Sequence, residues 1–186
     1  MRVTREQAAA NRARIVDVAS TLFRERGFDG IGVADIMKRA GLTHGGFYGH
    51  FPSKEDLSAE ITTRVLNEHN WLQRLTRVEN PTVRDVVRSY LSSRHREDPG
   101  HGCLFAALGC DVARQPRSVR HAFTEGLRFR IDALRRLLPG SAEARRRKAL
   151  ATMAGLVGAM TLSRAVDDPH LSNEILEAAA SMFSRI

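Results

Sequence analysis

Apolar residues recur along this chain at the spacing of α-helices, and no stretch gives the signal of a β-strand. A first helix is predicted to begin near Arg5, because Thr4 and Gln7 have the spacing of a capping box, and to end at Gly27. Its inner stripe consists of Ile15, Val18, Ala19, Leu22 and Phe23. Six prolines and few β-branched runs agree with this interpretation. The pattern therefore predicts an all-α protein of about nine helices.

Residues 33–57 give the most specific pattern, two short helices separated by a tight turn. Gly41 suits the left-handed residue that ends the first of these helices, and Thr43 can cap the second. Phe47 and Phe51 are four residues apart, so they are predicted to pack into the core from one side of the second helix. The other side carries Thr43, His44, Gly45, Tyr48, Gly49 and His50. This is the pattern of a helix-turn-helix.

The rest of the chain is predicted to form longer helices separated by turn signals. Ser53 is predicted to start a helix that runs to about Thr76. Asn80-Pro81 can open the next helix, and residues 95–101 are a loop by composition. Later helices are predicted at 102–115, at 118–138, from Ser141 to about Arg164, and from Ser172 to about Arg185.

The charge of a short segment says more about the partner of this chain than the net charge of the whole chain does. The formal net charge of +8 suggests an anionic partner, but residues 1–60 hold nine basic and eight acidic side chains. Residues 36–54 contain no acid and carry Lys38, Arg39, Lys54 and two histidines, which is more informative. The N-terminus has no apolar stretch like a signal peptide, and no run approaches the roughly 20 apolar residues that span a bilayer. A cytoplasmic protein with no membrane partner is expected.

The run AGLTHGGFYGHFPSKEDL, with RERGFDG before it, resembles the recognition-helix region of TetR/AcrR-type transcriptional regulators. The resemblance implies a helix-turn-helix DNA-binding domain over residues 1–56 and a larger helical effector-binding and dimerisation domain over residues 57–186. It implies double-stranded DNA as a partner, with base edges and phosphates met by Lys38, Thr43, His44, Gly45, Tyr48, His50 and Lys54. Gly32 departs from the Ser or Thr that the family commonly has there, so one phosphate contact is expected to be weaker.

Small residues recur at helical spacing on the two predicted C-terminal helices. Such a stripe lets another helix approach closely, and packing within one chain explains it as well as an interface does. The family resemblance implies that these helices form a four-helix interface in a homodimer, which would place two recognition helices roughly 34–36 Å apart. The interface residues that it implies are Ala151, Gly155, Gly158, Ala159, Leu162, Ile175, Ala178 and Met182.

The family's effector cavity lies among the middle helices, so the resemblance implies a site for a small-molecule effector there. Aromatic residues at helical spacing are also what a core requires. A cavity with few charges facing it would favour an apolar or weakly polar ligand. The candidate lining residues are Trp71, Tyr90, Cys103, Phe105, Leu108, Phe123 and Leu127.

The sequence predicts neither a disulfide between the two cysteines nor a metal site that includes them. Cys103 and Cys110 are seven residues apart, or roughly 10 Å along a helix axis, which is too far for a disulfide in an intact helix. Cys103 follows His101 at a predicted helix start, where the dipole and an imidazole could lower the thiol pKa; a small buried hydrophobe is the alternative. Gly-Cys at this point also resembles an electrophile- and oxidant-sensing branch of the family. The spacing fits no metal ligand set, and no cofactor is expected.

Three further functions compete with that of a ligand-responsive repressor. A transcriptional activator of the same fold remains open. A helical ligand-binding module with vestigial DNA binding is also open, because Gly32 and three glycines in the recognition helix weaken the DNA-reading pattern. A helical enzyme would need a third group beside Cys103 and His101, and none is evident, so no catalytic residue is assigned.

Overall fold

The computed structural model describes residues 4–66 and 71–186, apart from the side chains at positions 71 and 73. Within these ranges the chain forms ten α-helices and two 3₁₀ helices and no strand, which confirms the all-α prediction. The elements in chain order are α1 Arg5–Arg26, α2 Val33–Arg39, η1 His44–Gly49, α3 Lys54–Leu66, α4 Trp71–Thr76, α5 Val83–Tyr90, α6 Ser93–Glu97, η2 Pro99–His101, α7 Leu104–Val112, α8 Arg117–Leu137, α9 Ala142–Ala165 and α10 Pro169–Phe183.

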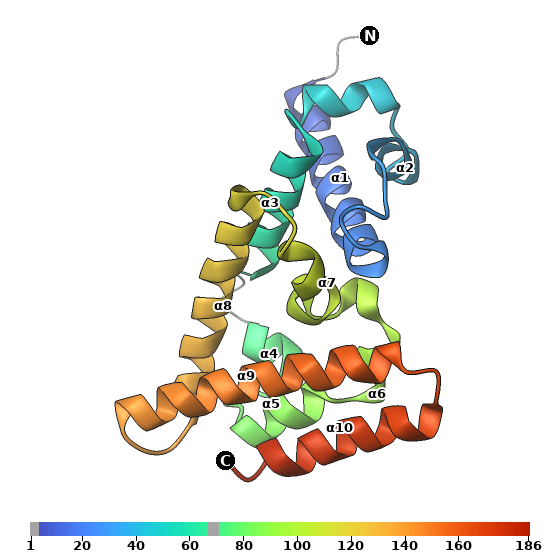
Figure 1. The fold of residues 1–186 in the computed structure, drawn as a ribbon. Helices are drawn as coiled ribbons and strands as arrows, with labels where there is room; N and C mark the ends of the chain where they lie inside the picture. The colour runs from blue at the N-terminus through green and yellow to red at the C-terminus, as the bar shows by residue number, and fades with distance from the viewer. Residues whose placement is uncertain (1–3, 67–70) are drawn as a thin grey trace.

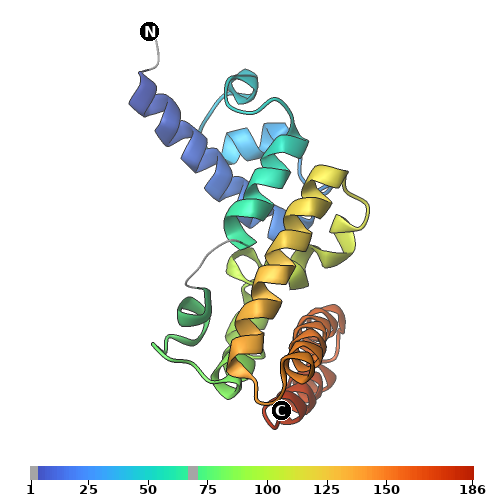
Figure 2. The same cartoon turned by 90° about the vertical axis from the view of Figure 1, so that its left-hand side faces the viewer.

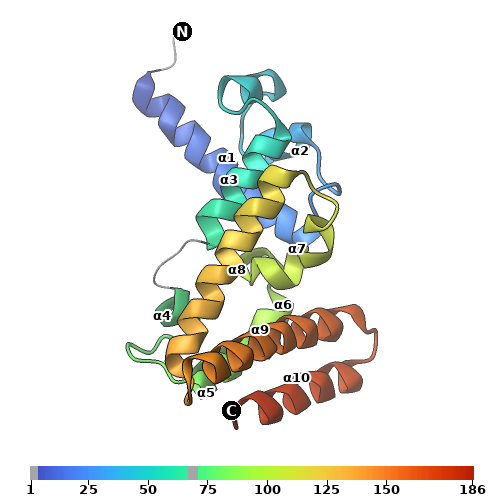
Figure 3. The ribbon, with the colours of Figure 1, turned by 60° about the vertical axis from the view of Figure 1, so that its left-hand side comes forward.

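The two ends of the molecule are built from different parts of the chain. The N-terminal helices α1 and α2 gather at one end, and α9 and α10 lie side by side across the other (Figure 1). Helices α3 and α8 run along each other between the two ends, as Figures 2 and 3 both show. No helix in the described part of the chain is long and apolar enough to cross a membrane.

Local capping explains where several helices begin and end. The Thr4 hydroxyl accepts a hydrogen bond from the Gln7 N–H at 3.1 Å, so α1 starts as predicted. Gly27 ends α1 with a φ of 78°, a left-handed backbone that favours glycine. Ser53 caps α3 by accepting from the Asp56 N–H at 3.1 Å, which confirms the predicted start.

Two predicted starts are wrong, because a neighbouring residue makes a better cap. Thr82, not Asn80, caps α5 in a reciprocal box with Asp85, where each side chain bonds the other residue's backbone N–H. Asp168, not Ser172, caps α10 through its carboxylate, which accepts from the His170 N–H at 2.8 Å. The Ser172 hydroxyl instead donates to the Ser163 carbonyl on α9 at 2.6 Å.

Two predicted elements have a different form. Where a helix was predicted to run to Thr76, the structure describes α3 up to Leu66 and the short helix α4, which packs against α5; residues 67–70 of the predicted helix lie outside the described residues. Residues 95–101, predicted as a loop, belong largely to α6 and η2. Asp98 caps η2 by accepting from the His101 N–H at 3.3 Å. Short helical turns with polar caps of this kind have too few apolar positions for a periodicity argument to detect.

One continuous apolar core joins the two ends. It runs from Ile15 and Phe23 of α1 through Ile61 of α3 to Leu134 of α8 and Leu156 of α9. The Arg24 Nε also donates to the Gly100 carbonyl of η2 at 2.6 Å, which connects α1 to the middle of the chain. The division into domains at residues 56 and 57 stays a prediction, and it falls at the start of a helix that packs against both parts.

Candidate DNA-binding surface and cavity

The turn between α2 and η1 is built by backbone hydrogen bonds and one arginine. Gly41 has a φ of 70° and donates to the Lys38 carbonyl at 3.1 Å, while the Leu42 N–H donates to the Met37 carbonyl at 2.9 Å. This is the left-handed helix end that the sequence predicted at Gly41. Arg14 of α1 donates to the Ala40 carbonyl at 3.4 Å and so ties α1 to the turn.

The recognition segment is a 3₁₀ helix rather than the α-helix that was expected. Thr43 stands at its N-cap position but makes no side-chain capping bond, and the Gly46 N–H donates to the Thr43 carbonyl at 3.0 Å in 3₁₀ fashion. Glycines in a helix cost about 1 kcal/mol each relative to Ala. Phe47 is fully buried and Phe51 is 2% exposed, as predicted. Burying a phenylalanine contributes roughly 1.5–3 kcal/mol, so the two rings offset the cost of three glycines.

The predicted DNA-binding residues belong to α2, to η1 and the residues that flank it, and to the first position of α3, and we call this set the reading surface. Five of them are exposed, and His50 and Lys54 are half-buried. Tyr48 is 64% exposed while its ring stands edge-on to Phe47, with centroids 5.4 Å apart. An aromatic side chain so exposed is available to a partner surface. The exposed members are Lys38, Thr43, His44, Gly45 and Tyr48.

The ion pair between Arg12 and Glu60, next to Phe51, was not predicted from the sequence. Arg12 of α1 donates to both carboxylate oxygens of Glu60 on α3, at 2.6 and 2.5 Å, and its guanidinium lies 4.5 Å from the centre of the Phe51 ring. The hydrogen bond to Glu60 raises the pKa of Arg12. The 48-residue separation of the two partners hides this pair from any local pattern. Arg12 thereby links α1 to α3 and covers the Phe51 ring, two residues after the end of η1.

Helices α3 and α8 approach closely where Leu66 meets Gly126. A Cβ added to Gly126 would stand 2.3 Å from the Leu66 Cβ, so only glycine fits there. Nearby, the side chain of Arg130 on α8 donates to the Val65 carbonyl at 3.0 Å. Val65 lies near the end of α3 as the structure describes it, so this bond joins α8 to that end of the helix. The same helix begins next to the reading surface.

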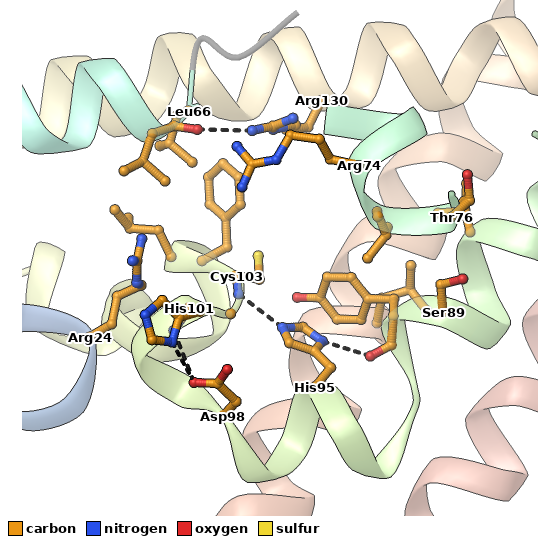
Figure 4. Close-up of a pocket in the computed structure, with 18 of the residues that line it drawn as sticks. Arg24, Leu66, Arg74, Thr76, Ser89, His95, Asp98, His101, Cys103 and Arg130 are labelled. Atoms are coloured by element: carbon orange, nitrogen blue, oxygen red, sulfur yellow. Dashed lines mark hydrogen bonds and ion pairs between the residues drawn. The ribbon is translucent and has the colours of Figure 1, made fainter. Parts of the chain in front are cut away.

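A cavity of about 700 Å³ lies where the ends of α1 and α3 meet the middle helices, and Figure 4 shows part of its wall. Of the candidate lining residues, the structure brings Tyr90, Cys103 and Phe105 into this wall. Leu108, Phe123 and Leu127 do not line it: Leu108 is fully buried in the core, and Phe123 packs on Phe105 with ring centroids 4.8 Å apart. The side chain of Trp71 lies outside the described residues.

His95 organises the wall around Cys103, and no local pattern in the sequence indicated this. Its Nδ1 is 2.7 Å from the Tyr90 carbonyl, and its Nε2 accepts from the Cys103 N–H at 2.9 Å (Figure 4). These partners require a neutral ring with the proton on Nδ1. Burial, with the nearby Arg164, lowers the pKa of His95. Burial, then the neighbouring Cys103 thiol, raise the pKa of the Tyr90 hydroxyl well above its ordinary value.

His101 does not play the role at Cys103 that its position in the sequence suggested. Its Nδ1 pairs with the Asp98 carboxylate at 2.9 Å, so the imidazole that meets Cys103 belongs to His95. Cys103 is half-buried at the N-cap of α7, and Cys110 is exposed on the same helix. Neither forms a disulfide. Among the described residues, no group of three His, Cys, Asp or Glu side chains could hold a metal ion.

The cavity does not meet the condition of few charges under which an apolar or weakly polar ligand was expected. The described wall residues include six arginines, contributed by α1, α3, α4, α6, α8 and the segment after α4. Single arginines scattered over several helices look like solvated surface in the sequence, and only the fold brings them to one space. The six are Arg24, Arg64, Arg74, Arg77, Arg94 and Arg130.

The stripe of small residues on α9 and α10 was explained in two ways from the sequence, by packing within the chain or by an interface with a second chain. Some of its residues are buried within the chain and others are exposed. Gly155 packs within the chain, since a Cβ there would stand 2.0 Å from the Phe183 ring, and Ala159 is buried as well. Gly158 and Ile175 are half-buried. Leu162 is 57% and Met182 67% exposed. The residues left facing outward are Ala151, Leu162, Ala178 and Met182.

Comparison with known proteins agrees with this geometry. The family model "Bacterial regulatory proteins, tetR family" matches residues 15–61, which span the whole helix-turn-helix. The transcriptional regulator TtgR of Pseudomonas putida is 28% identical over 161 residues, covering 78% of this chain and 77% of that protein. The transcriptional repressor NemR of Escherichia coli (strain K12) is 27% identical over 137 residues, covering 71% and 69%.

The fold is shared over almost the whole chain. The crystal structure of reduced E. coli NemR superposes with a TM-score of 0.76 and 23% identity, covering 95% of this chain and 96% of that one. The helix-turn-helix and the relatives together define a DNA-binding transcriptional regulator and not an enzyme. The helix-turn-helix part of the chain matches the tetR family model, and the relatives and structural neighbours of the chain are regulators of the TetR/AcrR family.

Proposed function

We propose that the protein is a ligand-responsive transcriptional repressor that binds a near-palindromic operator as a homodimer. The observation that carries this proposal is the path of α3, which begins at Lys54 of the reading surface and brings Val65 and Leu66, its last two residues, to the wall of the cavity. A ligand that changes this wall acts on the helix that supports the reading surface. NemR, a relative, is named as a repressor, and this supports repression over activation.

The reading surface supplies contacts of two kinds. Thr43, His44 and Gly45 stand at the start of η1, where base edges would be read, with Lys38 beside them. Tyr48, His50 and Lys54 would hold phosphates. Few long polar side chains face the groove, so we expect phosphate contacts to supply much of the affinity and DNA shape much of the specificity. Such a regulator acts on chromosomal DNA, so we place its action in the cytoplasm.

The exposed apolar side chains of α9 and α10 support a homodimer through these two helices. Leu162 and Met182 are large, apolar and mostly exposed, and a second copy of the chain would cover them in a two-fold interface. The two recognition segments would then meet successive major grooves, roughly 34–36 Å apart. This geometry requires an operator with two-fold symmetry.

Release from DNA follows from a difference in affinity. Suppose that the dimer also has a state in which α3 holds the two reading surfaces at another spacing. An effector that binds this second state better moves the population away from DNA, and the shift in free energy is no larger than its difference in affinity for the two states. An activator with the same reading surfaces and cavity would differ only in where its site lies relative to the promoter. Vestigial DNA binding would leave the reading surface without a specific site.

The test of this proposal is selection of the purified protein against random duplex DNA. We expect enrichment of an inverted repeat with half-sites one helical turn apart. A reporter placed behind that repeat should be repressed by the protein, and activation of the reporter would favour the activator. No enrichment above a salt-sensitive background would reject specific binding and favour the module with vestigial DNA binding.

A further inference from the structure

The wall of the cavity is strongly biased toward positive charge. Its described residues include the six arginines given above and only two acids, Asp17 and Asp98. Asp17 is paired with Arg64 at 3.2 Å, and Asp98 with His101 at 2.9 Å while it also caps η2. Both acids thus have partners of their own. Guanidinium groups thus outnumber carboxylates among the described residues of this wall, which favours an anionic group in the ligand.

Arg130 is the arginine that the fold holds most firmly. It is 7% exposed, and its bond to the Val65 carbonyl orients the guanidinium in the wall. Figure 4 shows Arg130 and Arg74 reaching the same part of the cavity, from α8 and α4 respectively. A guanidinium has five N–H donors in a planar fork, which matches the two oxygens of a carboxylate or the oxygens of a sulfonate or phosphate.

A large part of the remaining wall is apolar. It includes aliphatic and aromatic side chains from α3, α5, α7, α8 and α9. A body made of hydrocarbon would bury itself against them, at roughly 25 cal/mol for each Å² of apolar surface removed from water. These residues are Leu66, Val86, Leu104, Phe105, Leu134, Met153 and Leu156.

A buried hydroxyl also faces this space. Tyr90 lines the cavity and is 4% exposed, and its hydroxyl has no oxygen or nitrogen partner among the described residues, only the weakly bonding Cys103 thiol beside it. A buried hydroxyl without a partner costs about 1–3 kcal/mol, which a bound polar atom would recover. This is independent of the charge and indicates a second polar contact deeper in the same ligand.

We propose that the cavity binds an amphipathic organic anion, with its acid group at Arg130 and Arg74, its hydrocarbon body on the apolar wall, and a polar atom at the Tyr90 hydroxyl. The inference rests on the proposed function, because it names the chemical class of the effector. Arg130 also bonds the Val65 carbonyl of α3 through Nη2, so an acid group that draws this guanidinium toward itself acts on that bond. Binding is thereby linked to the helix that supports the reading surface.

The test uses two fluorescent probes that differ in charge, with the full chain free of DNA. 8-Anilinonaphthalene-1-sulfonate is an amphipathic anion, and N-phenyl-1-naphthylamine has the same aromatic body without the sulfonate. Each is titrated against wild type, Arg130→Gln and Arg74→Gln. Arg128→Gln is the matched control, because Arg128 is on the same helix, is exposed, and pairs with Glu125 outside the cavity.

We expect Arg130→Gln and Arg74→Gln each to weaken binding of the sulfonate by about tenfold, with a change below about twofold for the neutral probe and for Arg128→Gln. Arg74 lies on an exposed part of the short helix α4, so its variant carries the test if Arg130→Gln fails to fold. Equal binding of the two probes to wild type, or equal losses for both in the variants, would overturn the anion proposal. The operator selection uses no ligand, so a protein that selects its operator but fails here remains a repressor with a ligand of another class.

Discussion

Arg12 and Glu60 are joined by two parallel hydrogen bonds of 2.6 and 2.5 Å, and the Arg12 guanidinium covers the Phe51 ring at the end of the recognition segment. The pair connects α1 to α3 next to Phe51. Arg12 is 43% and Glu60 35% exposed in their side chains, so solvent screens the attraction. The pair therefore contributes little to the free energy of folding, and its main effect is to orient the Arg12 guanidinium over the Phe51 ring.

Arg12→Met should lower the free energy of unfolding by less than about 1 kcal/mol and still weaken operator binding, because Phe51 loses the group that positions it. Urea unfolding and fluorescence anisotropy on the selected operator measure the two effects. Arg147→Gln is the control, since Arg147 forms an equally short but fully surface pair with Glu143. Equal operator affinity for wild type and Arg12→Met would show that the pair does not position the recognition segment.

Alanine at two of the glycines in η1 should stabilise the protein. A Cβ at Gly45 or Gly49 meets nothing within 4 Å, and neither residue has a positive φ. Gly45→Ala and Gly49→Ala should each raise the free energy of unfolding by about 0.5–1 kcal/mol, measured in urea. Gly41→Ala should lower it instead, because Gly41 has a φ of 70°. Stabilisation by Gly41→Ala would contradict the assigned turn.

The close approach of α3 and α8 should tolerate no added methyl group. Gly126→Ala places a Cβ 2.3 Å from the Leu66 Cβ, so we expect a loss of about 1–3 kcal/mol in urea unfolding. Gly109→Ala is the matched control within α7, where an added Cβ meets nothing within 4 Å. Equal stabilities for the two variants would mean that α3 and α8 are not packed as the structure shows.

Stability should fall on mild acidification, and His95 should be the cause. Burial lowers the pKa of His95 from its ordinary value of 6.5, so the unfolded chain binds a proton before the folded chain does. The folded state therefore keeps its full stability above about pH 6.5 and loses it as the pH falls below, by at most about 1.4 kcal/mol per pH unit. Urea unfolding at pH 7.5 and 5.5 measures the loss.

His95→Gln should remove most of this difference between pH 7.5 and 5.5, although it also costs stability at both pH values. His170→Gln is the control, because the side chain of His170 is 83% exposed on α10. The depressed pKa values of Asp85 and Asp98 act below about pH 4, so they do not contribute in this range. An undiminished pH dependence in His95→Gln would assign the effect to another group.

Charges placed on the outer face of α9 and α10 should prevent dimerisation. The double variant Leu162→Glu, Met182→Glu puts four carboxylates into a two-fold interface, so the dimer dissociation constant should rise by at least about 100-fold in sedimentation. Tyr48→Ala changes η1, which is not part of the proposed interface, and should leave the dimer intact and weaken operator binding. A dimer that survives the double variant would place the interface elsewhere.

The sequence predicted most helices because their caps and apolar stripes are local. Ser141 caps α9 and Gly41 ends α2, as expected from the residues around them. The 3₁₀ form of η1 was not expected, although the three glycines that favour it were recognised. Asn80 and Ser172 are residue types that often cap helices, but Thr82 and Asp168 occupy the cap positions in the structure. The choice between candidates a few residues apart requires the folded backbone.

The cavity was predicted less completely, because its wall exists only after the helices pack. Tyr90, Cys103 and Phe105 were found from aromatic spacing and the position of the cysteine. His95 fell in a segment that reads as a loop, and Arg130 lies on a helix rich in arginines that looks solvated. No local pattern distinguishes a buried arginine from its exposed neighbours, so the charge of the cavity could not be foreseen.

The central claim is that the reading surface recognises a specific DNA sequence, and the most direct measurement is the ratio of affinities for the selected operator and a scrambled duplex at fixed salt. We expect a wild-type ratio of at least about 10³. His44→Ala should lower the ratio by about tenfold, whereas Lys54→Gln should weaken both duplexes alike. A wild-type ratio near one, unchanged by His44→Ala, would contradict sequence-specific recognition by this surface.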